Sequence, residues 1–205
     1  MLEAITYQKM LRDITRNQIS EDIIGILVTR PDLEGGSNIL NSLNYYHHLS
    51  GKNINFYLPG FGAYWHGAYP DEKMVARIDG IEWSYSDIMF IGFINDLELY
   101  SRWEYSGETE LLMLEYKDGI LSFDNVMQFH LDNMIRDKII VSIPAFFQQL
   151  FRITKNKKTL KKIRNIFGKD KIFQITKETV MEYIPSGLAH IITQEKYFCV
   201  KNCNK

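Results

Sequence analysis

The sequence has few of the residues that identify a protein class by themselves. Its 205 residues include two cysteines, Cys199 and Cys203, and both lie among the last seven positions. Such a pair provides no disulfide framework, so we expect reduced thiols and a cytoplasmic protein. A metal site at this pair would need two further ligands, and the five histidines have no metal-binding spacing. We therefore predict no metal and no cofactor.

Long hydrophobic runs are missing as well. No run approaches the roughly 18 apolar residues of a membrane helix, and the N-terminus lacks the basic-then-apolar order of a signal peptide. The sequence also lacks the phosphate-binding pattern GxxxxGK[ST], the dinucleotide pattern GxGxxG, the hydrolase pattern GxSxG and the zinc pattern HExxH. We expect no membrane span, and no motif fixes a reaction.

The composition is that of a globular protein, with 45% hydrophobic, 13% aromatic and 24% charged residues. The net charge of −1 conceals an uneven distribution. Residues 1–151 contain 21 acidic and 11 basic residues, whereas residues 152–205 contain 4 acidic and 13 basic residues. This separation of charge predicts two functionally different parts, an α/β domain over residues 1–140 and a basic helical region over residues 141–205.

The first third of the chain predicts a parallel βαβ unit. The apolar stretch DIIGILV, at 22–28, is typical of a strand covered on both faces, and NINFYLP, at 53–59, is a second strand. Between them the spacing predicts a helix over 38–49, with Ser37 as its N-cap. A further amphipathic helix is expected before this unit, over residues 2–16.

The rest of the chain gives one ambiguous and one clear signal. Residues 88–94 fit a buried strand, but the helical period over residues 86–103 favours a helix. Residues 110–123 predict an antiparallel hairpin, followed by a helix that Asp124 caps. Beyond Pro144 we predict helices only, at about 144–153, 157–167 and 177–196.

This element order resembles the thioredoxin-like fold over residues 20–138. Thioredoxins carry CxxC at the start of the helix after their first strand, where this chain has EGGS at 34–37. They also carry a proline before the first hairpin strand, where this chain has YSGE at 105–108. The resemblance implies a mixed central sheet flanked by helices, in a protein without dithiol redox activity, and an all-helical C-terminal region would follow this sheet.

A strand at residues 88–94 would change this interpretation. The order would then be similar to a Rossmann-type or TIR-like sheet. TIR-like enzymes carry a glutamate on the helix after such a strand, and Glu104 or Glu108 beside Trp103 would correspond to it. The hairpin that follows favours the thioredoxin-like layout.

Two strand ends are candidate binding sites, because ligands of parallel α/β sheets collect beyond the carboxyl ends of the strands. At the first end, Arg30 and Asp32 precede a Gly-Gly-Ser helix start at Ser37. Backbone N–H groups at a helix N-terminus suit an anion, and glycines allow close approach. A turn with a capping serine explains the same residues equally well.

The second end is aromatic. Pro59 and Gly60 end the strand, and Phe61 and then Tyr64, Trp65 and His66 follow in what we expect to be a loop. These residues form either a stacking surface for a base, a sugar or a partner, or a part of the core that folds back. If the two strands are adjacent, Trp65 and His66 could lie beside Arg30 and Asp32.

The basic segment 152–171 is the most pronounced compositional feature. An apolar stripe of Leu160, Ile163 and Phe167 is surrounded by basic side chains, which include Lys157, Lys158, Lys161, Lys162 and Arg164. Its counterpart could be nucleic acid, an anionic lipid surface, or acidic protein surface on this chain or a second copy.

Three functions remain open from the sequence. The leading hypothesis is a non-redox α/β binding or interaction module, acting as a component of a cytoplasmic assembly with a protein partner or by self-association. The first alternative is an enzyme acting on nucleotides or other phosphorylated small molecules, built around the residues of the two strand ends. The second alternative is nucleic-acid binding through residues 152–171. Convergence of these residues in one pocket favours the enzyme, and a filled end of the sheet favours the module.

Overall fold

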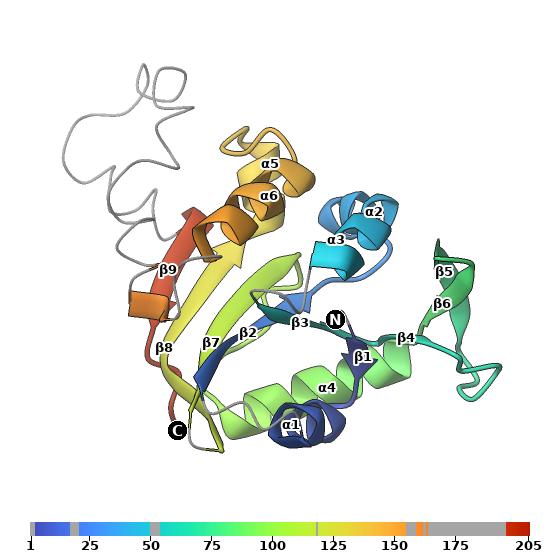
Figure 1. The fold of residues 1–205 in the computed structure, drawn as a ribbon, viewed down its shortest axis with the longest axis horizontal. Coiled ribbons are helices and arrows are strands. Elements are labelled where there is room, and N and C mark those ends of the chain that lie inside the picture. The colour runs from blue at the N-terminus through green and yellow to red at the C-terminus, as the bar shows by residue number, and fades with distance from the viewer. Residues whose placement is uncertain are drawn as a thin grey trace.

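The main sheet has six strands and is mixed (Figure 1). In this computed structural model the strand order is β1-β3-β2-β7-β8-β9. Strands β1, β3 and β2 are parallel, and β7, β8 and β9 each run antiparallel to their neighbour. Their bounds are Glu3–Ile5 for β1, Glu21–Val28 for β2, Asn55–Pro59 for β3, Glu110–Lys117 for β7, Ile120–His130 for β8 and Phe198–Lys201 for β9. The structure describes residues 3–16, 21–49, 54–117, 119–154, 159–161, 163 and 196–205.

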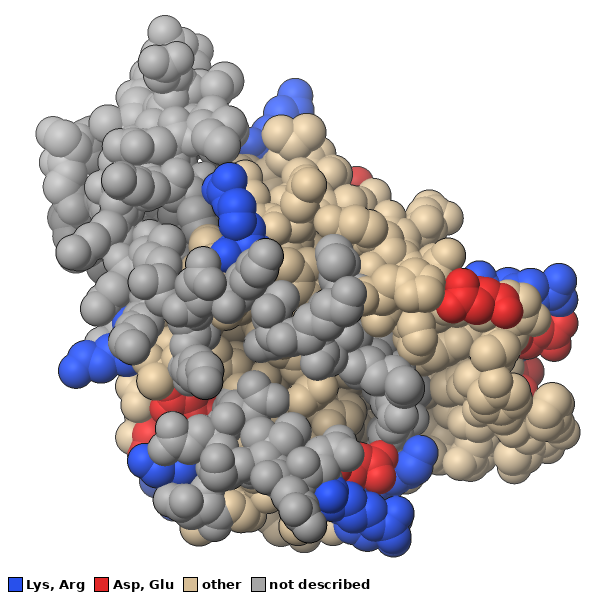
Figure 2. Space-filling model, viewed as in Figure 1, with Lys and Arg blue, Asp and Glu red and all other residues tan. Residues whose placement is uncertain are grey.

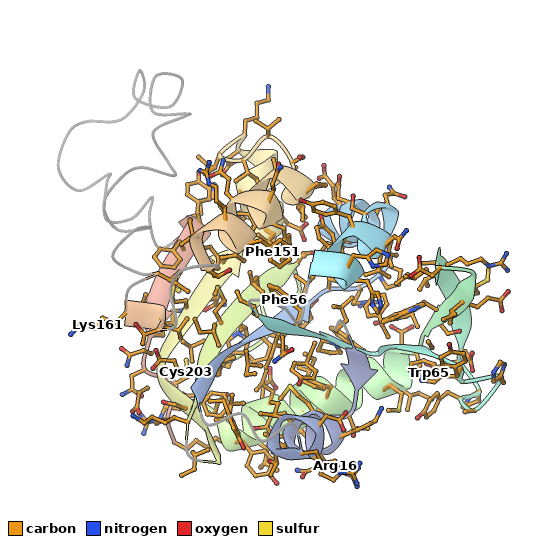
Figure 3. The ribbon with its side chains drawn as sticks, in the orientation of Figure 1. Arg16, Phe56, Trp65, Phe151, Lys161 and Cys203 are labelled. Carbon is orange, nitrogen blue, oxygen red and sulfur yellow. The ribbon has the colours of Figure 1, made fainter. Side chains whose placement is uncertain are left out.

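Helices cover both faces of this sheet. One face carries α1 (Tyr7–Arg16) and α4 (Asp87–Tyr100) (Figure 1). The other face carries α2 (Glu34–Asn41), α3 (Leu43–Leu49), α5 (Leu131–Arg136) and α6 (Ile143–Thr154). Phe56 of β3 packs edge to face on Phe147 and Phe151 of α6, which fixes α6 on the sheet (Figure 3). The expected mixed α/β architecture with flanking helices is confirmed.

A second, smaller sheet projects from the main one (Figure 1). Its strands β4 (Phe61–Ala63), β5 (Lys73–Ile78) and β6 (Ile81–Tyr85) are antiparallel in the order β4-β6-β5. Asp79 and Gly80 connect β5 to β6 with φ values of 50° and 81°, the left-handed backbone of a type I′ hairpin turn. Because Phe61 belongs to β4 and is fully buried, its assignment to the aromatic loop was wrong.

Three sequence predictions are confirmed. Strands β2 and β3 pair in parallel around the intervening helices, as the βαβ unit requires. Strands β7 and β8 form the predicted antiparallel hairpin, with Lys117 opposite Ile120. Residues 88–94 belong to α4, in which Phe90, Phe93, Ile94 and Leu97 are buried.

Several element boundaries differ from the prediction. The helix expected over 38–49 is two helices with a break at Ser42, and the first begins at Glu34, so Ser37 lies inside it and Leu33 is its N-cap. The helix expected over 2–16 begins at Tyr7, because residues 3–5 pair with β3 as strand β1. Pairing with the main sheet therefore outweighs the helical period at the N-terminus.

The helix predicted to begin at Asp124 is instead the second half of strand β8. Residues 126–130 pair with β7 on one side and largely with β9 on the other. A register irregularity between Met113 and Glu115 leaves Asp124 exposed beside the sheet. Two neighbouring strands provide more hydrogen bonds than a helical turn here, so the helix starts only at Leu131.

The prediction that only helices follow Pro144 is wrong at strand β9. Helix α6 matches the expected helix at 144–153, but residues 198–201 add an edge strand to the main sheet. The helix expected over 177–196 lies outside the described residues except for residue 196. Residues of α6 and Phe198 pack in the same hydrophobic core as residues before position 140. Among the described residues, no helix combines the length and apolar character needed to cross a membrane.

Candidate functional site

Arg30 follows the carboxyl end of β2 and is surrounded by carboxylates. Its Nε lies 3.3 Å from Asp32 Oδ1, and a terminal nitrogen lies 3.7 Å from Asp87 Oδ1 at the start of α4. Burial alone would lower the pKa of Arg30, but Asp32, Tyr85 and Asp87 raise it above its ordinary value. The Arg30 side chain as a whole is 43% exposed although its Nε is buried, and the protein's own acids already neutralise its charge.

Asp87 has two further partners from the small sheet. The hydroxyl of Tyr85 donates a hydrogen bond to Asp87 Oδ1 over 3.1 Å, and Lys73 Nζ lies 3.8 Å from Asp87 Oδ2. Burial, and then the nearby charge of Asp87, raise the pKa of Tyr85. We call this group the Arg30 cluster; it consists of Arg30, Asp32, Lys73, Tyr85 and Asp87. Its two cations and two carboxylates balance, which leaves little net attraction for a charged ligand.

The predicted anion cradle at the start of α2 is occupied by Asp132. Asp132 Oδ1 accepts a hydrogen bond from the Gly35 N–H over 2.7 Å, and Oδ2 accepts one from the Thr109 N–H, also over 2.7 Å. Both bonds are buried, as is the 2.9 Å hydrogen bond between the hydroxyls of Thr29 and Thr109. The N–H group that a phosphate would use therefore already binds a carboxylate.

The two glycines of α2 leave room for neighbouring atoms of the protein and not for a ligand. A Cβ at Gly35 would lie 2.4 Å from Asp132 Oδ1, and a Cβ at Gly36 would lie 1.8 Å from the Arg30 carbonyl oxygen. Both distances are far below van der Waals contact. The absence of a side chain thus allows α2 to pack on the end of β2.

The N-terminus of α4 is occupied in the same way. Ser86 caps this helix by accepting a hydrogen bond from the Met89 N–H. Asp71 Oδ1 accepts from the Ser86 hydroxyl over 2.7 Å, and Oδ2 accepts from the Ile88 N–H over 2.9 Å. The hydrogen bond from Ile88, followed by that from Ser86, lowers the pKa of Asp71.

Glu110 is a fully buried carboxylate at the start of β7. It accepts hydrogen bonds from Gln128 Nε2 over 2.7 Å and from the Trp103 indole over 3.2 Å. His130 Nδ1 lies 3.6 Å away. A carboxylate beside a histidine can act as an acid–base pair, but this carboxylate also fastens the loop between α4 and β7 to the sheet.

Tyr105 lies in the loop that Glu110 holds. Among the described residues its hydroxyl is buried without a hydrogen-bond partner. Burial raises the pKa of Tyr105 most, the charge of Glu110 raises it further, and Arg30 acts in the opposite direction. This hydroxyl is therefore an unused polar group within electrostatic range of the Arg30 cluster.

The aromatic loop, residues 64–69, lies at the outer end of the molecule on the side of the small sheet (Figure 3). Tyr64 is 67% exposed and His66 is also exposed. Trp65 is half-buried: it packs on Gly62, where a Cβ would lie 2.3 Å from the indole, and edge to face on Tyr69 at 4.8 Å. The Trp65 ring thus anchors the loop, and the rings of Tyr64 and His66 are exposed to solvent.

The backbone of the aromatic loop has an unusual conformation. Tyr64 and His66 have φ values of 61° and 51°, and Gly67 follows at 81°. The Gly67 N–H donates a hydrogen bond to Glu72 Oε2, and Glu72 Oε1 accepts one from the Ser84 hydroxyl. The small sheet therefore holds the loop in a left-handed conformation that a tyrosine rarely adopts.

The sequence-predicted site residues fall into separate groups. Arg30 and Asp32 are paired, and Ser37 is exposed on α2. In the part of the chain that the structure describes, Trp65 contacts the small sheet, and its contacts do not overlap with those of Arg30. A site shared by Trp65, His66 and Arg30 stays a prediction.

The basic segment is described only in part. Leu160 is 2% exposed and Ile163 is fully buried, both within the main core, and the Leu160 N–H donates a hydrogen bond to Glu115 Oε1 of β7 over 2.7 Å. Lys161 is exposed (Figure 3). On the face that Figure 2 shows, the acidic and basic side chains of the described residues are interspersed. The other predicted patch residues lie outside the described residues: Lys157, Lys158, Lys162, Arg164 and Phe167.

The sequence reasoning missed several residues of these clusters. Ser86 and Asp87 precede an apolar run, which is an N-terminal helix signal that could have located them. Asp132 had no local signal, because its two backbone partners are 97 and 23 positions away in the sequence. Contacts between residues so far apart in the sequence are set by the order of the strands in the sheet, so no local motif indicates them.

Comparisons with family models, with curated proteins and with solved structures find no match to this chain. Among the described residues, no three histidine, cysteine or carboxylate side chains gather as the ligands of a metal ion would. Any functional conclusion must therefore come from the geometry of the described clusters.

Proposed function

We propose that this chain is a non-redox α/β binding module that acts as a component of a cytoplasmic assembly, with the aromatic loop as its partner-facing surface. A thioredoxin-like layout is part of the proposal. Its support is a sheet in which three parallel strands adjoin an antiparallel hairpin. Cys199 and Cys203 are buried thiols at the opposite edge of that sheet from β1 (Figure 3 labels Cys203), which supports a role without dithiol chemistry.

One observation carries the proposal: the protein's own carboxylates fill the end of the sheet where a ligand would bind. Asp132 occupies the start of α2, Asp71 occupies the start of α4, and Asp32 and Asp87 neutralise Arg30. A phosphorylated ligand would have to displace at least one of these acids. Of these acids Asp132 is the buried one. Displacing it would leave two backbone N–H groups without their acceptor, at about 1–3 kcal/mol each, whereas Asp32 and Asp87 are partly exposed and oppose a ligand only by neutralising Arg30.

The conformation of the aromatic loop supports its role as the binding surface. Non-glycine residues with left-handed backbone cost on the order of 1 kcal/mol or more each, and they concentrate at functional sites. Here two such residues, Tyr64 and His66, present exposed rings on a base that Trp65 and Glu72 hold in place. Tyrosine rings combine an apolar face with a polar tip, as partner-binding surfaces often do.

The test is partner retention by variants of the full chain that change the aromatic loop. The chain is cross-linked in the cells that produce it and recovered as wild type, as Tyr64→Ala with His66→Ala, and as the control Tyr45→Ala. Tyr45 is also an exposed tyrosine but lies on α3. We expect a defined cross-linked partner with wild type and control, and its loss in the double variant with an unchanged melting temperature. Equal retention by the double variant would refute the proposed surface.

The role of Trp65 is tested in the same way. A fully buried tryptophan would cost about 3–5 kcal/mol of stability when replaced by alanine. Because Trp65 is only half-buried on Gly62, we expect Trp65→Ala to weaken partner retention more than stability. A full core-sized loss of stability in urea denaturation would show that Trp65 serves folding.

An enzyme acting on nucleotides or phosphorylated small molecules is the second candidate. The observation in its favour is the Tyr105 hydroxyl, buried without a partner within range of the Arg30 cluster. Such a hydroxyl could donate to a bound ligand. Ligand-dependent melting of the wild type separates the two candidates.

A further inference from the structure

Helix α4 is apolar on its outer side as well as on its inner side. Its inner residues, Phe90, Phe93, Ile94 and Leu97, are buried against the main sheet and α1. On the outer side, Ile88 and Ile91 are each 55% exposed and Leu99 is 61% exposed. A helix with apolar residues all round is normally covered on both sides, and the described residues leave this outer side open.

Three exposed apolar residues share one side of α4 with a glycine and an asparagine. Positions 88, 91, 92, 95 and 99 follow the spacing of a single helix face, and we call Ile88, Ile91, Gly92, Asn95 and Leu99 the α4 outer face. A Cβ placed on Gly92 would meet no atom within 4 Å, so the stripe has a shallow centre. A small residue at the centre of a stripe allows the backbone of another helix to approach closely.

Acidic residues lie on both sides of this stripe. Asp96 projects toward the α1 side, where its charge raises the pKa of Tyr7, whereas Glu98 projects toward the following loop and accepts a hydrogen bond from the Tyr105 N–H over 2.9 Å. Residues 87–100 contain three acidic residues and no basic one. An apolar stripe between carboxylates is complementary to an apolar stripe between cations.

We propose that the α4 outer face docks an amphipathic helix of a partner protein whose apolar stripe is flanked by lysines or arginines. A second copy of this chain fits less well, because pairing α4 with itself would bring the acidic flanks together. The area sets the strength of the contact and does not choose between the two occupants: α4 is about 21 Å long and about 10 Å wide, so its face is far smaller than the roughly 800 Å² per partner of a stable interface. The contact is weak, reversible and sensitive to salt.

This surface is distinct from the aromatic loop, so the inference goes beyond the proposed function and can fail independently of it. The test uses a fluorescein-labelled 18-residue synthetic peptide with leucines at positions i, i+3, i+4 and i+7 and lysines on both flanks. The full chain is titrated into this peptide, and fluorescence anisotropy is followed at low and at physiological salt. A second peptide carries glutamates in place of the lysines.

We expect saturable binding of the lysine peptide, weaker binding at higher salt and no binding of the glutamate peptide. Replacing Ile88, Ile91 and Leu99 with serine should weaken binding by about tenfold or more, and Asp96→Asn with Glu98→Gln should remove most of the salt dependence. The control variant Ile120→Ser with Val141→Ser changes two apolar residues elsewhere that are even more exposed, and it should bind like wild type.

Several outcomes would overturn the inference. Absence of saturable binding by wild type is one, and equal binding by the triple serine variant, with unchanged melting, is another. Binding of the glutamate peptide as tight as that of the lysine peptide would remove the charge argument. A wild-type dimer in native mass spectrometry that becomes a monomer in the triple serine variant would assign the face to a second copy instead.

Discussion

Asp132 is the residue on which the end of the sheet depends most. Its carboxylate binds the N–H groups of Gly35 and Thr109 and so joins α5, α2 and the residue just before β7 at one point. Asp132 is 8% exposed, and the two residues that donate to it, Gly35 and Thr109, are buried as well. Buried backbone donors that lose their acceptor retain the full cost of desolvation. The main role of Asp132 is therefore to stabilise the fold.

Replacement of Asp132 by alanine should therefore make the folded protein less stable. Two buried donors lose their acceptor, and we expect Asp132→Ala to lower the free energy of unfolding by about 2–5 kcal/mol. The measurement is urea denaturation followed by circular dichroism. The control is Asp32→Ala, whose side chain is 65% exposed and should cost less than about 1 kcal/mol. Equal small losses in the two variants would contradict the structural role.

The Asp71 carboxylate should make the stability of the folded protein depend on pH in the acidic range. Its hydrogen bonds to Ile88 and Ser86 lower its pKa in the folded state, so the stability it contributes is present above its ordinary pKa of about 4 and is lost as the pH falls through the lowered value. Melting temperatures of wild type and Asp71→Asn should differ at pH 7 and converge toward pH 2. A constant difference from pH 7 to pH 2 would show that Asp71 does not act through its charge.

At the scale of elements, the glycines of α2 and α4 have opposite roles. A Cβ at Gly36 would collide with the Arg30 carbonyl, whereas a Cβ at Gly92 would point into open space. Gly36 allows α2 to pack on the end of β2. Gly92 lies on the exposed side of α4, where a side chain would meet no other atom. Identical substitutions should therefore have effects of opposite sign.

The predicted pair is Gly36→Ala and Gly92→Ala. We expect Gly36→Ala to destabilise by about 1–3 kcal/mol through overpacking. Gly92→Ala should stabilise by up to about 1 kcal/mol, because alanine loses less backbone entropy in a helix than glycine does. Both values come from chemical denaturation of the purified variants. A neutral Gly36→Ala would mean that α2 does not pack on β2 as closely as described.

The elements that the sequence predicted well are those with local signals. Strand β2 is a continuous apolar run, and the apolar residues of α4 recur with the period of a helix. The sequences of β7 and β8 are separated by a turn signal of lysine, aspartate and glycine. The small sheet was missed although Asp79-Gly80 is a strong hairpin signal, because its flanking strands are short and partly polar. Strand β9 and the second half of β8 were missed for another reason: they are strands because they pair with each other across about 70 residues of chain.

The position of the candidate site was predictable only in part. Arg30 and Asp32 follow the carboxyl end of β2, whereas the aromatic loop follows β4 of the small sheet and not β3. That Asp132 and Asp71 fill the helix starts could not be foreseen, since both reach them from distant segments. Local patterns indicate where polar groups are, but only tertiary structure shows which of them are already satisfied.

At the scale of the whole molecule, the described part of the basic segment packs against the acidic first part of the chain through its apolar residues. Leu160 and Ile163 belong to the main core, and Glu115 accepts a hydrogen bond from the Leu160 N–H. The apolar stripe of the segment is thus buried where it is described. We expect its cations to meet acidic protein surface, and this stays a prediction for the lysines beyond Lys161.

Replacing Lys157, Lys158, Lys161 and Lys162 with glutamine should lower stability modestly, by about 0–1 kcal/mol per exposed pair, and more at low salt than at high salt. Leu160→Ala should cost more, about 2–5 kcal/mol, because it removes a buried side chain. Both are measured by thermal melting over a salt series. Retention of duplex or single-stranded nucleic acid by wild type, lost in the glutamine variant at unchanged melting, would instead assign the segment to nucleic-acid binding.

The central claim is that the protein's own carboxylates fill the ligand-binding end of the sheet, and ligand-dependent melting tests it directly. Wild type, Arg30→Gln, and Asp32→Asn with Asp87→Asn are melted with increasing inorganic phosphate and, separately, with a nucleoside triphosphate. A ligand at 100 times its dissociation constant would stabilise its binder by about 2.7 kcal/mol. We predict no saturable shift for wild type, and a phosphate-dependent rise for the double asparagine variant, in which Arg30 has lost both counter-charges. A saturable rise in wild type that disappears in Arg30→Gln would contradict the claim and identify an anion-binding enzyme site.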